Sequence, residues 1–234
     1  YEKLNDFLNP QYPFESGFFK KVNFLFDSIS YIYKFSIDTL RRSILKGQYQ
    51  LPKGIYFGGD SYQPEMKALN SIWDATVPGY QKIIYIDLHT GYGEKGKLHL
   101  IAGHSESQLA QKITDLYSPT PIDFGNAKNF YETSGDVLTY FTEKYKKQSE
   151  IIPVAFEFGT LNSQQTWGSI ESLYRMRSEN QAYQYKTADA ASAAVVKKLF
   201  KDMFYPSEFE WRDQVLVQTK AELDKIIKRL ESAD

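Results

Sequence analysis

The sequence predicts an α/β fold, in which a mixed, largely parallel sheet is flanked by helices and followed by a helical layer at the C-terminus. Two apolar runs, KIIYIDLHTG at residues 82–91 and IIPVAFEFGT at residues 151–160, have the composition of strands covered on both faces. Segments with a helical spacing of apolar residues lie between and after these runs. Strands that alternate with helices are typical of α/β proteins.

The part of the chain before the first apolar run contains two predicted helices. Apolar residues at helical spacing predict a helix over residues 28–46, and Gly47 follows it where a C-cap glycine belongs. Residues 48–63 are rich in Gly, Pro and Tyr and predict an extended loop, after which Pro64 begins the second helix. The first 19 residues are rich in aromatic side chains and are interpreted as a loop.

The remaining elements follow from the same patterns. KLHLIAG, at residues 97–103, predicts a strand, and residues 107–118 and 136–147 predict two helices. The run at 82–91 is interpreted as a central parallel strand. After Thr160 the pattern is helical in three segments, at residues 164–177, at 189–204 and from Ser207 onward. The length of 234 residues suits one sizeable domain.

Composition excludes several classes of function. The net charge of −1 and the isoelectric point of about 6.4 give no basic surface for a polyanion, so we expect no nucleic-acid partner. Cysteine is absent, which excludes disulfides and thiolate metal sites and leaves His, Asp and Glu as the strong ligands. No apolar run approaches the roughly 20 residues that span a bilayer. We therefore expect a soluble protein without a membrane partner; the compartment stays open, with the cytoplasm favoured.

His89 is the first candidate for chemistry, because it lies at the end of an apolar strand. Ligands of open α/β sheets bind beyond the carboxyl ends of the strands. Asp87 is two residues away and points to the same side of the strand, where its carboxylate could orient the imidazole. The alternative interpretation of His89 is a core histidine that is hydrogen-bonded for structure.

Glu157 is the second candidate, because it lies between two phenylalanines inside the other apolar strand. Burial disfavours the charged form and raises the pKa of a carboxyl group toward the range in which it can accept and return a proton near neutral pH. The alternative is a buried salt bridge or a hydrogen bond to the backbone, which would perturb the pKa as well.

The segment from Gly91 to Gly96 fits the pattern GxGxxG, which suggests a dinucleotide site. That pattern requires a helix that begins within the glycines, whereas the segment that follows alternates like a strand. We therefore interpret it as a glycine turn. His99 and His104 follow, and both are interpreted as ordinary surface or core residues. No HxxE, HxxxH or HExxH spacing exists in the sequence, so the chain lacks the usual local zinc motifs.

The order of the motifs resembles a bacterial branch of the zinc carboxypeptidase superfamily, near the succinylglutamate desuccinylase and aspartoacylase group. Residues 47–59, GQYQLPKGIYFGG, resemble the GQY-x-x-P-x-G-x-x-x-GG loop of that branch. Residues 87–91 resemble its DLHTG motif, residues 156–160 its EFGT strand end, and residues 204–212, FYPSEFEWR, a segment near its C-terminus. The resemblance covers most of the chain and implies a zinc carboxypeptidase-like, phosphorylase/hydrolase-like fold.

The resemblance also implies roles for individual residues. His89 corresponds to the third ligand of a single zinc ion and Glu157 to the general base, with Asp87, Thr90 and Gly91 beside the ligand or lining the pocket. The first two ligands belong to an upstream H-x-x-E motif, which this sequence does not contain. We therefore expect residues 1–234 to be the C-terminal portion of one domain, whose N-terminal segment is the chain's possible partner and supplies the missing ligands.

Two functions from different classes follow. The first is zinc-dependent hydrolysis of a peptide or amide bond, by a carboxypeptidase-like enzyme or a deacylase, with a peptide or an N-acyl amino acid as substrate. The second is a catalytically inactive fragment or pseudoenzyme that binds a peptide or partner without metal. Metal analysis separates the two.

Overall fold

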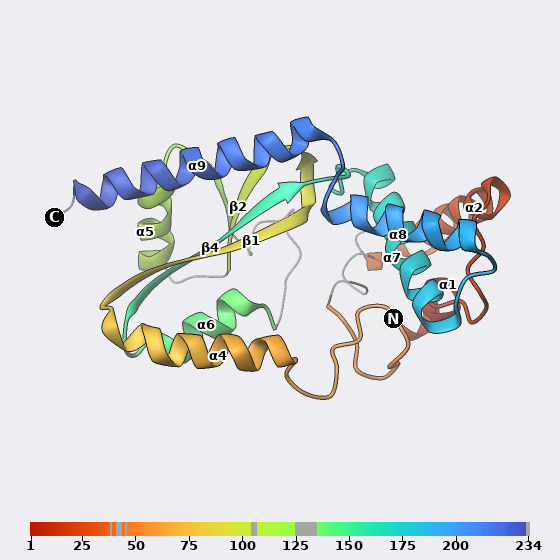
Figure 1. Cartoon of the computed structure of the whole chain (residues 1–234), viewed down its shortest axis with the longest axis horizontal. Coiled ribbons are helices and arrows are strands. Elements are labelled where there is room, and N and C mark those ends of the chain that lie inside the picture. Colours follow the sequence, from red (N-terminus) through yellow and green to blue (C-terminus); the bar gives the residue numbers. More distant parts are fainter. Residues whose placement is uncertain (38, 41–43, 45, 104–106, 125–134, 233–234) are drawn as a thin grey trace. The chain divides into compact units, whose positions relative to one another are not determined.

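The computed structural model describes residues 1–234 apart from 38, 41–43, 45, 104–106, 125–134 and 233–234 (Figure 1). The chain forms two compact units, and each unit consists of three separate segments. Unit 1 comprises residues 1–59, 90–95 and 159–212, and unit 2 comprises residues 60–89, 96–158 and 213–234. The expectation that the chain is the C-terminal portion of a single domain stays a prediction.

Unit 1 is mainly helical. Its helices are η1 (Glu2–Leu4), α1 (Asn5–Leu8), α2 (Phe18–Phe35), α7 (Thr166–Tyr185) and α8 (Ala190–Phe204). They pack around one core of buried apolar side chains, in which the ring of Phe24 from α2 lies 5.1 Å from that of Tyr174 from α7. Asp189 caps the start of α8, because its carboxylate accepts a hydrogen bond from the backbone N–H of Ser192 at 2.6 Å.

Two sequence-based expectations for unit 1 are wrong in part. The first 19 residues are not a loop throughout, since they contain η1, α1 and the start of α2. Helix α2 begins ten residues earlier than the predicted start at Ser28, and it ends at Phe35, because Ser36 adopts a positive φ of 62°. Beyond Ser36 the described residues 37, 39, 40 and 44 are again helical, and Gly47 has the positive φ of 72° that suits the predicted C-cap. Residues 38, 41–43 and 45 of the predicted helix lie outside the described residues.

Unit 2 contains most of a four-stranded sheet with the order β1-β4-β2-β3. The strands are β1 (Lys82–Lys95), β2 (Leu98–Ala102), β3 (Ile122–Phe124) and β4 (Glu150–Gly159). Strand β2 is parallel to β3 and antiparallel to β4. Strands β1 and β4 run in the same direction, since Glu150 bonds to Gln81 near one end and Gly159 lies against Glu94 near the other. The mixed, largely parallel sheet is therefore confirmed.

Two details of the sheet differ from the prediction. Among the described strands β1 has only β4 as a neighbour, so it is an edge strand and not a central one. Its residues from Lys82 to Tyr92 are all partly buried or exposed, as suits a strand at the edge of the sheet. Strand β4 matches the expectation, because every residue after Glu150 is buried. Strand β3 was not predicted, since its three residues are too few to show a periodicity.

Helices cover both faces of the sheet in unit 2 (Figure 1). Helices α4 (Pro64–Thr76) and α6 (Val137–Tyr145) cover one face, where Phe141 and Tyr145 share a core with Ile151 of β4. Helices α5 (Ser107–Tyr117) and α9 (Phe209–Glu231) cover the other, where Tyr117 meets the ring of Phe156 at 6.0 Å. Helix α9 is the predicted C-terminal layer. Among the described residues, no helix is long and apolar enough to span a membrane.

Candidate functional site

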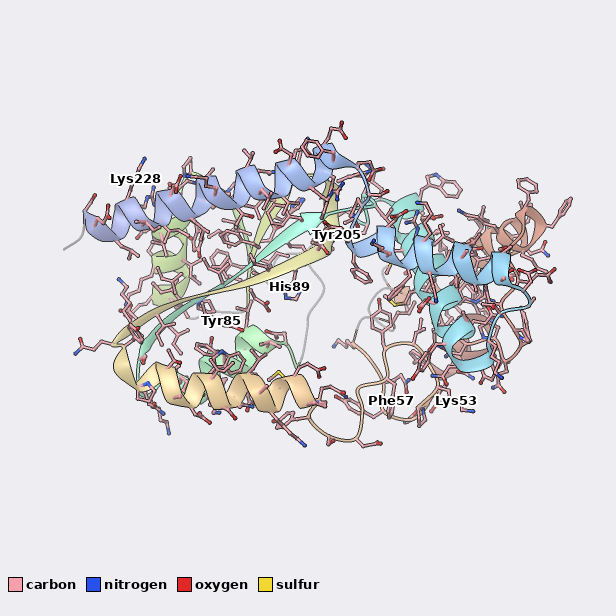
Figure 2. The ribbon with its side chains drawn as sticks, in the orientation of Figure 1. Lys53, Phe57, Tyr85, His89, Tyr205 and Lys228 are labelled. Carbon is pink, nitrogen blue, oxygen red and sulfur yellow. The ribbon has the colours of Figure 1, made fainter. Side chains whose placement is uncertain are left out.

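The candidate site lies on the α4/α6 face of the sheet. Side chains two residues apart on a strand share a face, so Tyr85, Asp87 and His89 of β1 point to one side. Tyr85 stacks on Phe141 of α6 at 4.3 Å, which identifies that side as the α4/α6 face. Figure 2 shows Tyr85 and His89 on the side of β1 that faces α6. Tyr85 at one end of this row is partly buried against the core of α6, whereas His89 at the other end is exposed.

Asp87 fixes the orientation of the His89 ring. Nε2 of His89 lies 2.8 Å from Oδ2 of Asp87. A carboxylate can only accept, so the ring carries its proton on Nε2 and donates it to Asp87. In the neutral ring this leaves a lone pair on Nδ1, which is the atom available to a metal ion. This contact is of the kind predicted for Asp87, and the role of His89 as a metal ligand stays a prediction.

Glu157 of the neighbouring strand completes the group. Its Oε2 lies 3.9 Å from Nδ1 of His89. Glu157 is an even number of residues from Ile151, so the strand alternation also turns its side chain toward the α4/α6 face. The Glu157 side chain is 12% exposed, whereas that of His89 is 51% exposed. A buried carboxylate therefore lies beside an accessible imidazole.

The surroundings of His89 are negatively charged. The hydrogen bond to Asp87 raises the pKa of His89 above its ordinary value, burial opposes this, and the charges of Asp87, Glu157 and Asp136 raise it further. Asp136 is the N-cap of α6, where its carboxylate accepts the backbone N–H of Thr139 at 2.8 Å. Three carboxylates around one imidazole favour a cation at this position.

The sheet register adds His99 to this face. His99 of β2 lies directly opposite Glu157 of β4 in the antiparallel pair, and directly opposed residues share a face. Glu157 thus has a histidine-bearing strand on each side, with His89 on β1 and His99 on β2. The sequence interpretation treated His99 as ordinary, because the strand was recognised but its pairing register was not.

The predicted pocket residues Thr90 and Gly91 make their contacts in unit 1. The hydroxyl of Thr90 donates to the backbone carbonyl of Phe204 at 2.6 Å, and the carbonyl of Gly91 accepts from the hydroxyl of Ser163 at 3.2 Å. Asp87, His89 and Glu157 are the predicted site residues that the structure brings together within unit 2.

The residues that follow Glu157 have structural roles in unit 1. A Cβ atom at Gly159 would lie 2.1 Å from the backbone carbonyl oxygen of Glu94, so only glycine fits there. The buried hydroxyl of Thr160 donates to the carbonyl of Met203 at 2.6 Å, and Nε1 of Trp211 donates to the carbonyl of Gly159 at 2.8 Å. The EFGT motif therefore joins the end of β4 to α8 and α9.

The glycine segment contains no helix start. Strand β1 continues to Lys95, and β2 begins at Leu98. Gly91, Gly93 and Gly96 all have positive φ angles, which suits a strongly bent strand and the turn after it. The prediction that a strand follows this segment is confirmed, and the helix N-terminus that a dinucleotide site of this type requires does not occur there.

The described residues meet part of what a zinc ion needs. His89 fits a ligand, because Asp87 holds Nε2 and leaves Nδ1 available, and the surrounding carboxylates favour a cation. Within the described part of the chain no group of three or more His, Asp or Glu side chains is arranged to hold a metal. His104 lies outside the described residues. The described residues thus offer one histidine ligand and its supporting carboxylate.

Comparisons with known proteins give one match. A family model described as "Protein of unknown function (DUF2817)" matches residues 1–218. No curated protein and no solved structure matches the chain.

Proposed function

The chain belongs to the DUF2817 family, and we propose that it acts as a zinc-dependent hydrolase of peptide or amide bonds, with His89 as a metal ligand and Glu157 as the general base. The observation that carries the proposal is the position of His89, whose Nε2 bonds to Asp87 at 2.8 Å while Nδ1 lies 3.9 Å from Glu157. A ligand oriented by one carboxylate, beside a second carboxylate that can accept a proton, is the arrangement that metal-assisted hydrolysis needs.

His89 would hold the metal from this side of the site, with its ring oriented by Asp87. The remaining ligands are expected from a segment upstream of Tyr1, as the resemblance to zinc carboxypeptidases implies. Zinc, when bound, supplies a Lewis acid that polarises the substrate carbonyl and lowers the pKa of water to about 7. His99 and Asp136 have no assigned role in this proposal.

Glu157 would carry the proton. Its carboxylate accepts a proton from the attacking water and returns it to the leaving nitrogen when the carbon–nitrogen bond breaks. Its low exposure excludes most competing water, and the accessible His89 beside it leaves the carbonyl a path of approach. The products are a carboxylate and an amine, so proton and water are balanced in the step.

The substrate class rests on the resemblance alone. It is a peptide or an N-acyl amino acid, cleaved by a carboxypeptidase-like enzyme or by a deacylase. The alternative is an inactive chain that binds a peptide or partner without metal. It would use the same face of the sheet but would not hydrolyse what it binds.

The test is the Glu157→Gln variant of the full-length protein, assayed on N-acyl amino acids and short peptides. The variant keeps its zinc, because Glu157 is not a ligand, and loses turnover by about a hundredfold or more, which is the usual contribution of general acid–base catalysis. His99→Gln is the matched control, since it changes the residue opposite Glu157 and keeps the base. Unchanged turnover in Glu157→Gln would refute the role of Glu157. A folded, metal-free, inactive wild type would favour the binding alternative.

A further inference from the structure

Unit 1 contains a cavity of about 530 Å³ that the proposed hydrolase chemistry does not use. It lies among α1, the loop that follows α1, α2 and α7, and its lining includes Phe7, Tyr12, Asp27, Tyr31 and Arg177. A volume of this size falls within the range of about 300–1,000 Å³ that is usual for small-molecule sites. The cavity lies wholly within unit 1, whereas Asp87, His89 and Glu157 belong to unit 2.

Arg177 is the cation of this cavity. Its guanidinium carbon lies 5.6 Å from the ring centre of Phe7 and 5.2 Å from that of Phe24, so aromatic rings hold the group in place. Burial lowers the pKa of Arg177, which Tyr12 and Asp27 oppose, and an arginine keeps its charge under such conditions. The Nε atom is buried and has no hydrogen-bond partner among the described residues. The guanidinium therefore retains capacity for a further acceptor.

Two carboxylates line the same cavity. Asp6 at the start of α1 and Asp27 in α2 are both exposed. Neither forms an ion pair with Arg177 at a distance of 4.0 Å or less within the described part of the chain, although Asp27 is close enough to influence its pKa. The cavity thus presents one cation and two anions that do not neutralise one another by contact.

Two aromatic rings form an apolar part of the cavity wall. The ring of Tyr31 stacks on that of Phe7 at 4.6 Å, and both residues line the cavity. Phe7 is buried, whereas Tyr31 is only partly buried, so Tyr31 is the more accessible of the two aromatic residues. Aromatic rings of this kind bind apolar or aromatic side chains.

We propose that this cavity binds a small zwitterion of the α-amino-acid type with an apolar side chain. Its carboxylate pairs with the guanidinium of Arg177, its ammonium group with Asp27 and Asp6, and its side chain packs on Tyr31. A ligand with only a negative charge would meet the two carboxylates unpaired, and a ligand with only a positive charge would meet Arg177. A zwitterion satisfies both signs, and an arginine suits a carboxylate because its planar donors match the two oxygens.

The test is calorimetric titration of the full-length protein with three probes of similar shape. L-phenylalanine carries both charges, 3-phenylpropionate carries only the carboxylate and phenethylamine carries only the ammonium group. L-phenylalanine should bind saturably, and each single-charge probe should bind at least about tenfold more weakly, equivalent to about 1.4 kcal/mol. No saturable binding of L-phenylalanine at millimolar concentrations would overturn the proposal.

Variants locate the site. Asp27→Asn should weaken L-phenylalanine about tenfold or more, and Glu15→Gln, which removes a surface carboxylate paired with Lys20 in the same unit, should not. Arg177→Gln should abolish binding. Because Arg177 packs against the core, circular dichroism checks that the Arg177→Gln variant is folded. If that variant does not fold, Asp27→Asn still tests the proposal. Equal binding of 3-phenylpropionate and no effect of Asp27→Asn would contradict the zwitterion assignment.

His89→Ala separates this proposal from the hydrolase. It should leave L-phenylalanine binding unchanged, because His89 belongs to the other unit. Binding that survives in a protein without zinc or turnover would leave the cavity assignment intact and count against the hydrolase alone.

Discussion

The carboxylate of Asp87 accepts a hydrogen bond from Nε2 of His89 at 2.8 Å, and both residues lie on the face of β1 that α4 and α6 cover. The pair exists because residues two apart on a strand share a face. It determines which ring nitrogen of His89 is left for a ligand. The proposed metal site depends on this contact more than on any other described interaction.

The first prediction concerns the pKa of His89 in the metal-free protein. The hydrogen bond to Asp87 is the largest cause of its raised pKa, so Asp87→Asn should lower that pKa toward the ordinary value of 6.5. The residual elevation comes from Glu157 and Asp136. An NMR titration of the imidazole signals measures the change. Asp115→Asn, on the exposed face of α5, should leave the His89 titration unaltered.

The sign of the linked stability follows from this shift. A pKa raised in the folded state stabilises the protein at pH values below the ordinary value of 6.5, and this contribution is lost as the pH rises through the folded pKa. Asp87→Asn should therefore flatten the stability profile in that range. A His89 pKa that stays raised in Asp87→Asn would mean that another group holds the ring.

The second prediction concerns Gly159 at the end of β4. A methyl group there would collide with the backbone carbonyl of Glu94 at 2.1 Å, and backbone cannot move aside as a side chain can. Gly159→Ala should lower the free energy of unfolding by about 2 kcal/mol or more, as overpacking does. Chemical denaturation measures the difference.

Gly79 is the matched control for this prediction. A Cβ atom at Gly79 meets nothing within 4 Å, and its φ is not positive. Gly79→Ala should therefore stay within about 0.5 kcal/mol of the wild type, or stabilise it slightly. Equal effects of the two substitutions would show that Gly159 is not closely packed against β1.

The third prediction concerns Glu171 of α7, which pairs with Lys21 and Arg175 at 2.8 Å each. Burial raises the pKa of Glu171, but the hydrogen bonds from Lys21 and Arg175 outweigh it, and the pKa falls below the ordinary value of 4.5. A depressed carboxyl pKa stabilises the fold above pH 4.5, and this contribution is lost as the pH falls through the folded pKa.

Glu171→Gln should therefore lower the free energy of unfolding by about 0.5–1 kcal/mol at neutral pH, a modest value because the pair is partly exposed. The difference from the wild type should shrink as the pH approaches the folded pKa. Glu143→Gln is the control, because it removes the ion pair of Glu143 with Lys146, which is more exposed than that of Glu171. It should lower the free energy of unfolding by less. A loss of stability in Glu171→Gln that is constant down to pH 3 would contradict the ion-pair explanation.

The sequence predicted the main elements because their patterns are local. The apolar run of β4 and the proline at the start of α4 each define an element without knowledge of its neighbours. His89 and Glu157 were found together because each lies near the end of an apolar strand, and those two strands proved adjacent. The zinc and the hydrolysis stay predictions.

The remaining features of the site depend on distant parts of the chain. His99 lies beside Glu157 only through the antiparallel register of β2 and β4, which no local pattern specifies. Asp136 influences His89 from the start of α6, although its sequence signal is an ordinary N-cap. The cavity at Arg177 likewise requires α1, α2 and α7 to meet. Local periodicity cannot reveal such contacts.

The zinc content of the full-length protein and its His89→Ala variant, measured by mass spectrometry of the purified proteins, tests the central claim most directly. The account predicts about one zinc ion per chain in the wild type, since catalytic zinc sites use three protein ligands for one ion. It also predicts loss of zinc in His89→Ala and retention in His99→Ala, the other histidine beside Glu157. A folded wild-type protein without zinc, or a His89→Ala variant that keeps it, would contradict the account.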